Sequence, residues 1–300
     1  MKEEALLKEI EAKYEKYGEN PATYLNGLLH AKPLNYWDYV QVETLLSLQN
    51  PRTEYKDEPI FIMYSQITEL ILKSILHELK QITGENTPSE EMLLVKLNRL
   101  NNYVRMLLSF FNMMKEGLSY EEYSLFRKTL TPASGFQCVQ FRYVELYCTR
   151  LENLASKDSL KQGQPSPSVE NSFENIYWKE AGVNRKTGKK TLTLLQFEEK
   201  YLDTLLRLAK EIEGKTLEDK ILQLPVLSPQ LKNKLAEFDH LYNIEWPLVH
   251  LETAKHFLDR NGENKAATGS SEWKKYLHPD TQKRRFFPSL VTKEVLEDKK

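Results

Sequence analysis

The sequence predicts an all-α protein, and three observations support that prediction. Glycine is scarce, with 11 residues in a chain of 300. Apolar residues recur at spacings of three and four over long segments, which is the pattern of helices that bury one face. The strict apolar–polar alternation of half-buried strands is rare. A chain of this length is long enough to bury a sizeable core, so we expect a single large helical domain over residues 1–300.

Each predicted helix has its own signal in the sequence. Residues 2–17 are charged and amphipathic, and residues 60–83 place apolar side chains along one stripe. Residues 88–116 follow Ser89, a residue type that caps helix N-termini. The remaining predicted helices cover residues 36–49, 120–130, 136–155, 194–213, 217–223 and 228–260.

The stretch 156–190 differs from the rest of the chain. It contains GQPSPS and NRKTGKK and has few apolar residues, which is typical of a surface loop. We therefore predict a mobile surface insertion at 156–190. A linker between two domains is the alternative, but neither side holds a self-sufficient core, so a single domain is favoured.

Composition and charge exclude several classes of protein. The formal net charge is −1, which argues against nucleic acid as the main partner. The first residues, MKEEALLKEIEAKYEKYGEN, lack the order of a signal peptide, and no apolar run approaches the ~20 residues that cross a bilayer. Cys138 and Cys148 do not form a disulfide scaffold. We expect a cytoplasmic protein without a membrane partner.

The first candidate for chemistry is His250, in EWPLVHLETAKHFLDRNG. At ~100° per residue it shares an apolar helix face with Ala254, Phe257 and Leu258, whereas His256 turns toward water. An imidazole among apolar groups suits an axial haem ligand. The alternative is a core histidine bonded to a carbonyl group, and spacing alone favours that alternative.

The second candidate is Arg142, in TPASGFQCVQFRYVE. A guanidinium among apolar neighbours can hold a carboxylate by two parallel hydrogen bonds. The alternative is an internal ion pair with a glutamate such as Glu145 or Glu69. The third candidate is the loop ENKAATGSSEW, residues 263–273, whose N–H and O–H groups could close on a polar ligand. Loops of this composition are more often simple turns.

Taken together, these stretches resemble one family. YWDYVQVETLLSLQ, DEPIFIMYSQITELILK, TPASGFQCVQFRYVE and WPLVH followed by ATGSSEWKKYL occur in an order and spacing similar to the tryptophan 2,3-dioxygenase family. The resemblance runs from about residue 22 to 290 and is weak at 156–235. It implies an all-helical homotetramer with a haem b pocket, which uses O2 to open the indole ring of L-tryptophan, giving N-formyl-L-kynurenine in the kynurenine pathway.

The resemblance also implies roles for individual residues. His250 is similar to the proximal iron ligand, and Arg142 to the residue that binds the substrate carboxylate. Thr268 is similar to the loop residue that meets the substrate ammonium group, and Phe61 to an aromatic wall of the indole pocket. Three positions match residues that reach a neighbouring subunit's pocket in the family: Tyr36, Tyr39 and Val40.

The chain departs from the family pattern at several positions. Ser65 stands where the family usually has the histidine that bonds the indole N–H, and Pro247 follows a tryptophan that is commonly followed by arginine. The loop reads ATGSS where GTGGS is usual, and a few more residues than usual separate His250 from Thr268.

The serine at position 65 does not by itself exclude the reaction. Addition of both oxygen atoms to the C2–C3 bond requires no net proton removal by the enzyme. Losing one neutral hydrogen bond costs ~0.5–1.5 kcal/mol, so Ser65 is expected to have a minor polar role. The smaller side chain also leaves space for a substituted indole. Two alternatives stay open: insertion of one oxygen into an indole or another aromatic amino acid for biosynthesis, and a non-catalytic homologue that binds tryptophan or haem.

Overall fold

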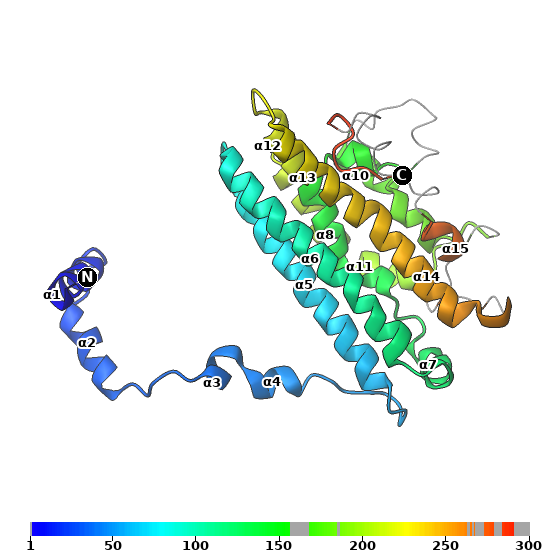
Figure 1. Ribbon diagram of the computed structural model, residues 1–300, viewed down its shortest axis with the longest axis horizontal. Coiled ribbons are helices and arrows are strands. Elements are labelled where there is room, and N and C mark those ends of the chain that lie inside the picture. Colours follow the sequence, from blue (N-terminus) through cyan, green and yellow to red (C-terminus); the bar gives the residue numbers. More distant parts are fainter. Residues whose placement is uncertain are drawn as a thin grey trace. The chain divides into compact units, whose positions relative to one another are not determined.

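The computed structural model describes residues 2–156, 168–184, 187–262, 265, 267, 273–278 and 284–290. The chain divides into two units, Met1–Asn50 and Pro51–Lys300. The described residues form helices and no strand (Figure 1), with only two isolated β-bridges. The all-α prediction is confirmed, and the single domain over residues 1–300 stays a prediction.

The unit Met1–Asn50 has no buried side chain among its described residues. It contains α1 (Glu3–Glu15), α2 (Pro21–His30), α3 (Tyr36–Val40) and α4 (Val42–Leu46). The predicted helix 36–49 is divided at Gln41, whose φ of 59° is left-handed and interrupts the helical path. Helix α2 was missed, although the sequence signals its start: the Asn20 side chain accepts from the Ala22 N–H, and Pro21 occupies the first turn.

Two long helices dominate the second unit. Helices α5 (Glu58–Gly84) and α6 (Glu90–Gly117) pack along each other (Figure 1). The cap of α6 is the predicted one, because Ser89 Oγ accepts from the Met92 N–H at 3.2 Å. Helix α8 (Val139–Cys148) packs on α5, and α13 (Pro229–His240) and α14 (Trp246–Leu258) pack on α6. Helix α8 is shorter than the predicted 136–155.

The remaining elements of this unit are short, apart from one long amphipathic helix, α11. They are α7 (Tyr120–Phe126), η1 (Arg127–Leu130), η2 (Gly135–Gln137), η3 (Leu151–Leu154), α10 (Val169–Glu174), η4 (Tyr177–Gly182), α11 (Leu192–Ile212), α12 (Leu217–Leu222), η5 (Leu241–Glu245), η6 (Arg260–Gly262) and α15 (Trp273–Tyr276).

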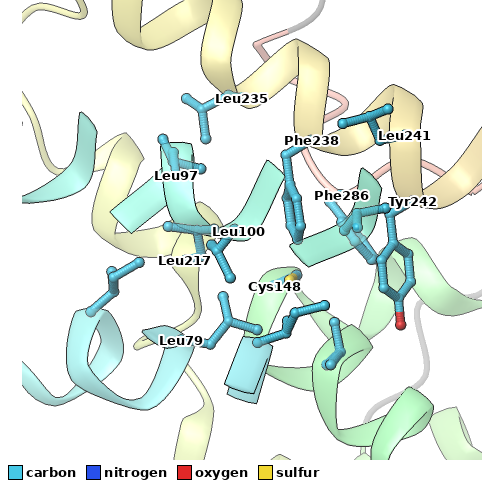
Figure 2. Packing of buried hydrophobic residues seen from close by; sticks show 14 of the residues in the cluster. Leu79, Leu97, Leu100, Cys148, Leu217, Leu235, Phe238, Leu241, Tyr242 and Phe286 are labelled. Atoms are coloured by element: carbon cyan, nitrogen blue, oxygen red, sulfur yellow. The ribbon is translucent and has the colours of Figure 1, made fainter. Parts of the chain in front are cut away.

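The main core lies where α5, α6, α8, α12 and α13 meet. Figure 2 shows Leu79, Leu97, Cys148 and Phe238 converging there from four of these helices. Phe286, near the end of the described chain, is fully buried in the same cluster. The carboxyl-terminal segment 284–290 is therefore part of the core that holds the long helices together.

The predicted surface insertion at 156–190 is wrong for residues 168–184. Four side chains of this segment are buried in a second core against α11: Phe173, Ile176, Tyr177 and Trp178. The stretch has few apolar residues overall, but they are concentrated in FENIYW, and one short apolar run is enough to anchor a segment. Residues 157–167 and 185–186 lie outside the described residues.

Helix α5 is the one described helix that is long and apolar enough to cross a bilayer by length and composition. The core helix of a water-soluble fold meets the same criterion. Several side chains of α5 are buried against α6 and α8, including Leu72, Ile75 and Leu79. The helix is therefore a packed element of this unit.

We predict that Leu97→Ala lowers the free energy of unfolding by about 2–5 kcal/mol, because Leu97 is fully buried where α6 meets its neighbours. Val226→Ala is the matched control, since Val226 is 76% exposed and its loss is expected to change stability by less than about 0.5 kcal/mol. Chemical denaturation of both variants measures this. Equal effects would show that Leu97 is not in the core.

Candidate functional site

The helix that carries His250 is joined to α13 by a π-turn. Residues Leu241–Glu245 form η5, in which the Trp246 N–H donates to the Leu241 carbonyl, five residues back. Pro247 follows, and its ring nitrogen has no hydrogen to donate to the Asn243 carbonyl. The wider turn lets the chain continue from α13 into α14 despite the proline. The predicted helix 228–260 is thus one continuous path with a π-turn inside it.

The π-turn decides which side chain of α14 faces α6. Leu231, Leu235 and Phe238 mark the buried stripe of α13. At ~100° per residue, an uninterrupted α-helix would carry that stripe on to Val249. One extra residue in the turn delays the register by one position, and the His250 ring then lies against Phe111 of α6, next to Val249, which packs against the main core.

His250 packs against α6, and part of its side chain stays exposed. Its ring centroid is 5.6 Å from that of Phe111 on α6. The side chain is exposed to a water-sized probe, yet the surrounding protein lowers its pKa from 6.5 to about 4 by desolvation. Many protein atoms surround the ring and lower its pKa, and part of the ring surface stays accessible. The imidazole is therefore neutral near pH 7 and accessible to a ligand.

The core-histidine alternative requires a hydrogen bond from the imidazole N–H to a carbonyl oxygen. Within the described part of the chain, no residue is hydrogen-bonded to His250. His256, by contrast, is exposed, as the helical pattern predicted. The ring nitrogens of His250 are thus available on its open side, as a metal ligand requires.

Phe61 belongs to a group of aromatic rings from three helices, α5, α7 and α14. The Phe61 ring is 5.8 Å from Tyr123 and 5.8 Å from Phe126, between centroids. Tyr123 in turn lies 4.4 Å from Phe257, which is buried two turns after His250 on α14. The predicted pocket wall Phe61 therefore belongs to an aromatic cluster that includes the His250 helix.

A second path of rings links α5 to His250 directly. Tyr64, on α5, is 5.9 Å from Phe111, and Phe111 is the ring next to His250. We call the rings of Phe61, Tyr64, Phe111, Tyr123 and Phe257 the aromatic pocket cluster. Together with His250 they bring α5, α6, α7 and α14 to one place.

Ser65 lies on α5 one turn after Phe61 and is half-buried. Its Oγ donates to the Phe61 carbonyl at 3.0 Å, which is the usual way that serine satisfies itself inside a helix. The hydroxyl hydrogen is therefore engaged within the helix, while the oxygen lone pairs can accept from a ligand N–H.

Arg142 is part of a different cluster. Its Nη1 donates to Tyr177 Oη at 2.8 Å and lies 3.4 Å from each oxygen of Glu145. Arg284 also contacts Glu145 and Tyr177. We call Arg142, Glu145, Tyr177 and Arg284 the buried charge cluster. The internal pair with Glu145 is thus present, whereas Glu69 accepts from Gln140 Nε2 at 2.6 Å.

A further arginine, which was not among the residues predicted from the sequence, lies beside the aromatic pocket cluster. Arg127, on η1, is half-buried and follows Phe126, and its side chain is hydrogen-bonded to Tyr123. Burial raises the pKa of the Tyr123 hydroxyl, and Arg127 opposes that rise. The signal was available, because Tyr123 and Arg127 are four residues apart, which places them on one helical face.

The other predicted site residues lie outside the described residues or in the other unit. Thr268 lies outside the described residues. Tyr36, Tyr39 and Val40 are exposed in the unit Met1–Asn50, at 71%, 75% and 38%. Among the described residues, no three His, Cys, Asp or Glu side chains gather as a metal-binding group.

Comparison with known proteins points to one family. Residues 26–159 match the family model of tryptophan 2,3-dioxygenase. Tryptophan 2,3-dioxygenase of Sorangium cellulosum is 36% identical over 157 residues, 46% of this chain and 38% of that protein. The enzymes so named from Anaeromyxobacter sp. strain K and Xanthomonas oryzae are 34% and 37% identical over 117 and 115 residues.

Those two matches cover 39% and 37% of this chain and 44% and 38% of the relatives. The chain thus matches less than half the length of these curated relatives. The family-model match contains Phe61, Ser65, Arg127 and Arg142, whereas His250 lies beyond it.

The lowered pKa of His250 predicts a pH dependence of stability. Between pH 6.5 and about 4 the unfolded imidazole binds a proton that the folded one does not, so the free energy of unfolding falls as pH falls through this window. His250→Gln removes this contribution. The free energy of unfolding, measured by denaturation at several pH values in this window, should therefore fall less steeply with falling pH in the variant than in the native chain. Equal slopes in the two proteins would contradict a lowered pKa of His250.

Proposed function

Because the chain is a member of the tryptophan 2,3-dioxygenase family, we propose that it is a haem-dependent dioxygenase. The proposed reaction opens the indole ring of L-tryptophan with O2 to give N-formyl-L-kynurenine. The observation that carries the proposal is the accessible, neutral imidazole of His250 beside the aromatic pocket cluster. A cytoplasmic location and a homotetramer are parts of the same proposal.

The residues around His250 fit a haem b group. The imidazole is accessible on one side, has no hydrogen-bonded partner in the described part of the chain, and lies beside the apolar ring of Phe111. A neutral, accessible imidazole beside an apolar ring is what an axial haem ligand needs on the iron side, and its second ring nitrogen would take a partner of its own. When bound, the haem would supply the O2 chemistry, and the protein would supply binding and orientation.

The aromatic pocket cluster supports binding of the indole ring. Phe61 and Tyr123 present apolar surface to a flat aromatic group. Thr268 is proposed to meet the ammonium group. Tyr36, Tyr39 and Val40 are proposed to complete the pocket from a neighbouring subunit, and their exposure leaves them available for such a contact.

The substrate carboxylate requires a cation near the aromatic pocket cluster. Arg142 and Arg127 are the two candidates. Arg142, the residue first predicted, already lies against Glu145 and Tyr177. Drawing it toward a substrate would weaken contacts within a buried polar network. Arg127 instead hydrogen-bonds Tyr123, a member of the aromatic pocket cluster. We therefore propose Arg127 as the carboxylate ligand, and Arg142 is the alternative.

Ser65 is proposed to accept a hydrogen bond from the indole N–H, since its own hydrogen is donated to the Phe61 carbonyl. A hydroxyl is shorter than an imidazole, so this bond orients the ring and removes no proton. The smaller side chain also favours a second candidate function, in which a substituted indole or another aromatic amino acid is oxygenated. A homologue that binds without turnover is the remaining rival.

The mass of the product separates these functions. We expect the haem-loaded, reduced protein to convert L-tryptophan with O2 to a product that has gained two oxygen atoms. A gain of one oxygen atom would support the alternative oxygenation, and haem binding without turnover would support the non-catalytic homologue. Either result would contradict the proposed dioxygenase reaction.

We predict that Arg127→Leu lowers kcat/KM for L-tryptophan by about 10- to 150-fold, mainly through KM, because a charge-assisted hydrogen bond is worth roughly 1.5–3 kcal/mol. Arg142→Leu is the comparison, and its main effect should be a loss of stability, since Glu145 would lose one partner. Steady-state kinetics and denaturation of both variants measure this. A raised KM in Arg142→Leu alone would move the role to Arg142.

Ser65→Ala is predicted to lower kcat/KM by no more than about tenfold, the effect of one neutral hydrogen bond. Ser65→Thr keeps the hydroxyl and serves as the matched control. A loss of more than a thousandfold in Ser65→Ala alone would show that the serine has a larger catalytic role than proposed.

A further inference from the structure

A cleft of about 410 Å³ opens beside the η1–η2 segment. Its lining includes none of Phe61, Ser65, Arg127, Arg142 and His250, although part of the lining begins two residues after Arg127, so the function proposed above does not assign it. The volume is within the range of small-molecule sites, roughly 300–1,000 Å³. All of its lining residues belong to the unit Pro51–Lys300.

The polar lining of the cleft is cationic and neutral. Five polar side chains line it, and none is acidic: Arg52, Thr129, Thr131, Gln137 and Gln196. Arg52 is exposed and forms no salt bridge with the described residues, although its charge helps to lower the pKa of the nearby Glu58 carboxyl. A cleft with one cation and no carboxylate favours an anionic ligand over a cationic one.

The backbone that carries Arg52 is fixed by a buried carboxylate. Glu58, which is 1% exposed, accepts from the Arg52 N–H at 2.9 Å and from the Thr53 N–H at 2.8 Å. The guanidinium therefore extends from an anchored loop. Only its own side-chain freedom must be lost when a ligand binds.

The lining residues Pro132 and Gln137 are hydrogen-bonded to Thr193 of α11. Thr193 Oγ1 donates to the Pro132 carbonyl at 2.9 Å, and Gln137 Nε2 donates to the Thr193 carbonyl at 3.2 Å. Gln137 Nε2 is also 3.4 Å from Gln196 Oε1. Gln196 accepts this hydrogen bond with its amide oxygen. Its two amide N–H groups can therefore donate to a ligand in the cleft.

The lining also has an apolar part, at residues 130, 132 and 133. A single guanidinium with neutral donors suits one carboxylate, since groups of higher charge are usually held by several cations. We propose that this cleft binds a small organic carboxylate with an apolar or aromatic body, through an ion pair with Arg52 and hydrogen bonds from Gln196.

The test is a ligand-observed NMR titration of the full chain with phenylacetate and its neutral isostere phenylacetamide. We expect phenylacetate to bind at least about tenfold more tightly than phenylacetamide, because a charge-assisted bond exceeds a neutral one by this much. Equal affinity of the two probes, or no binding of either at 10 mM (about the weakest binding of interest), would overturn the proposal.

Variants locate the binding. Arg52→Gln should weaken phenylacetate about tenfold, and Gln196→Trp should block the cleft, whereas Lys56→Gln, on the same loop but outside the lining, is expected to leave affinity unchanged. Phe61→Ala reports on the aromatic pocket cluster. Loss of binding in Phe61→Ala with retention in Arg52→Gln would place the carboxylate in that pocket and contradict the cleft. The result is independent of turnover, so failure here leaves the proposed dioxygenase activity untouched.

Discussion

The π-turn before α14 is the constraint on which the candidate site depends. Pro247 has no N–H to continue an α-helical ladder, and the Trp246 N–H reaches back five residues to Leu241 instead. That one wider turn shifts the register of α14, so that the His250 ring lies against Phe111 of α6 while Val249 packs against the main core. The chemistry proposed for this protein therefore rests on a backbone feature upstream of the residue that carries it. The proline that departs from the family pattern is compatible with the site because the turn accommodates it.

The second unit contains two side-chain clusters with different environments. The aromatic pocket cluster surrounds an accessible imidazole, whereas the buried charge cluster ties α8 to η4 and to the carboxyl-terminal segment through Glu145. Arg142 contacts four aromatic rings at 5.3–5.9 Å in addition to Glu145. Such a residue holds elements together. Arg127 instead lies beside Tyr123, a member of the aromatic pocket cluster, and is the residue proposed above for the substrate carboxylate.

The sequence predicted the helices well where periodicity was long. Helices α5, α6 and α11 and the Ser89 cap follow from apolar spacing and capping chemistry. The break at Gln41 and the π-turn at Leu241–Glu245 were not predicted, because no local residue type requires a left-handed or π conformation there. The anchoring of residues 168–184 was missed because average composition conceals one short apolar run, FENIYW.

The site was predictable in part. His250 and Phe61 emerged from a helical face and from the family resemblance, and the structure brings both to the aromatic pocket cluster. Arg142 was predicted to bind the substrate carboxylate because it lies among apolar neighbours in the sequence. The same environment also suits a structural ion pair. Spacing along one helix does not reveal which glutamate or tyrosine a different segment will supply, and here Tyr177 and Arg284 come from far along the chain.

The most direct test of the central claim is a hemin titration of the full chain, followed by the Soret absorption band, for the native sequence and for His250→Ala and His256→Ala. Ligation by the accessible imidazole of His250 predicts saturation at one hemin per chain in the native protein and in His256→Ala, with loss of the shifted band in His250→Ala. A native protein that takes up no hemin, or a His250→Ala variant with an unchanged spectrum, would contradict it.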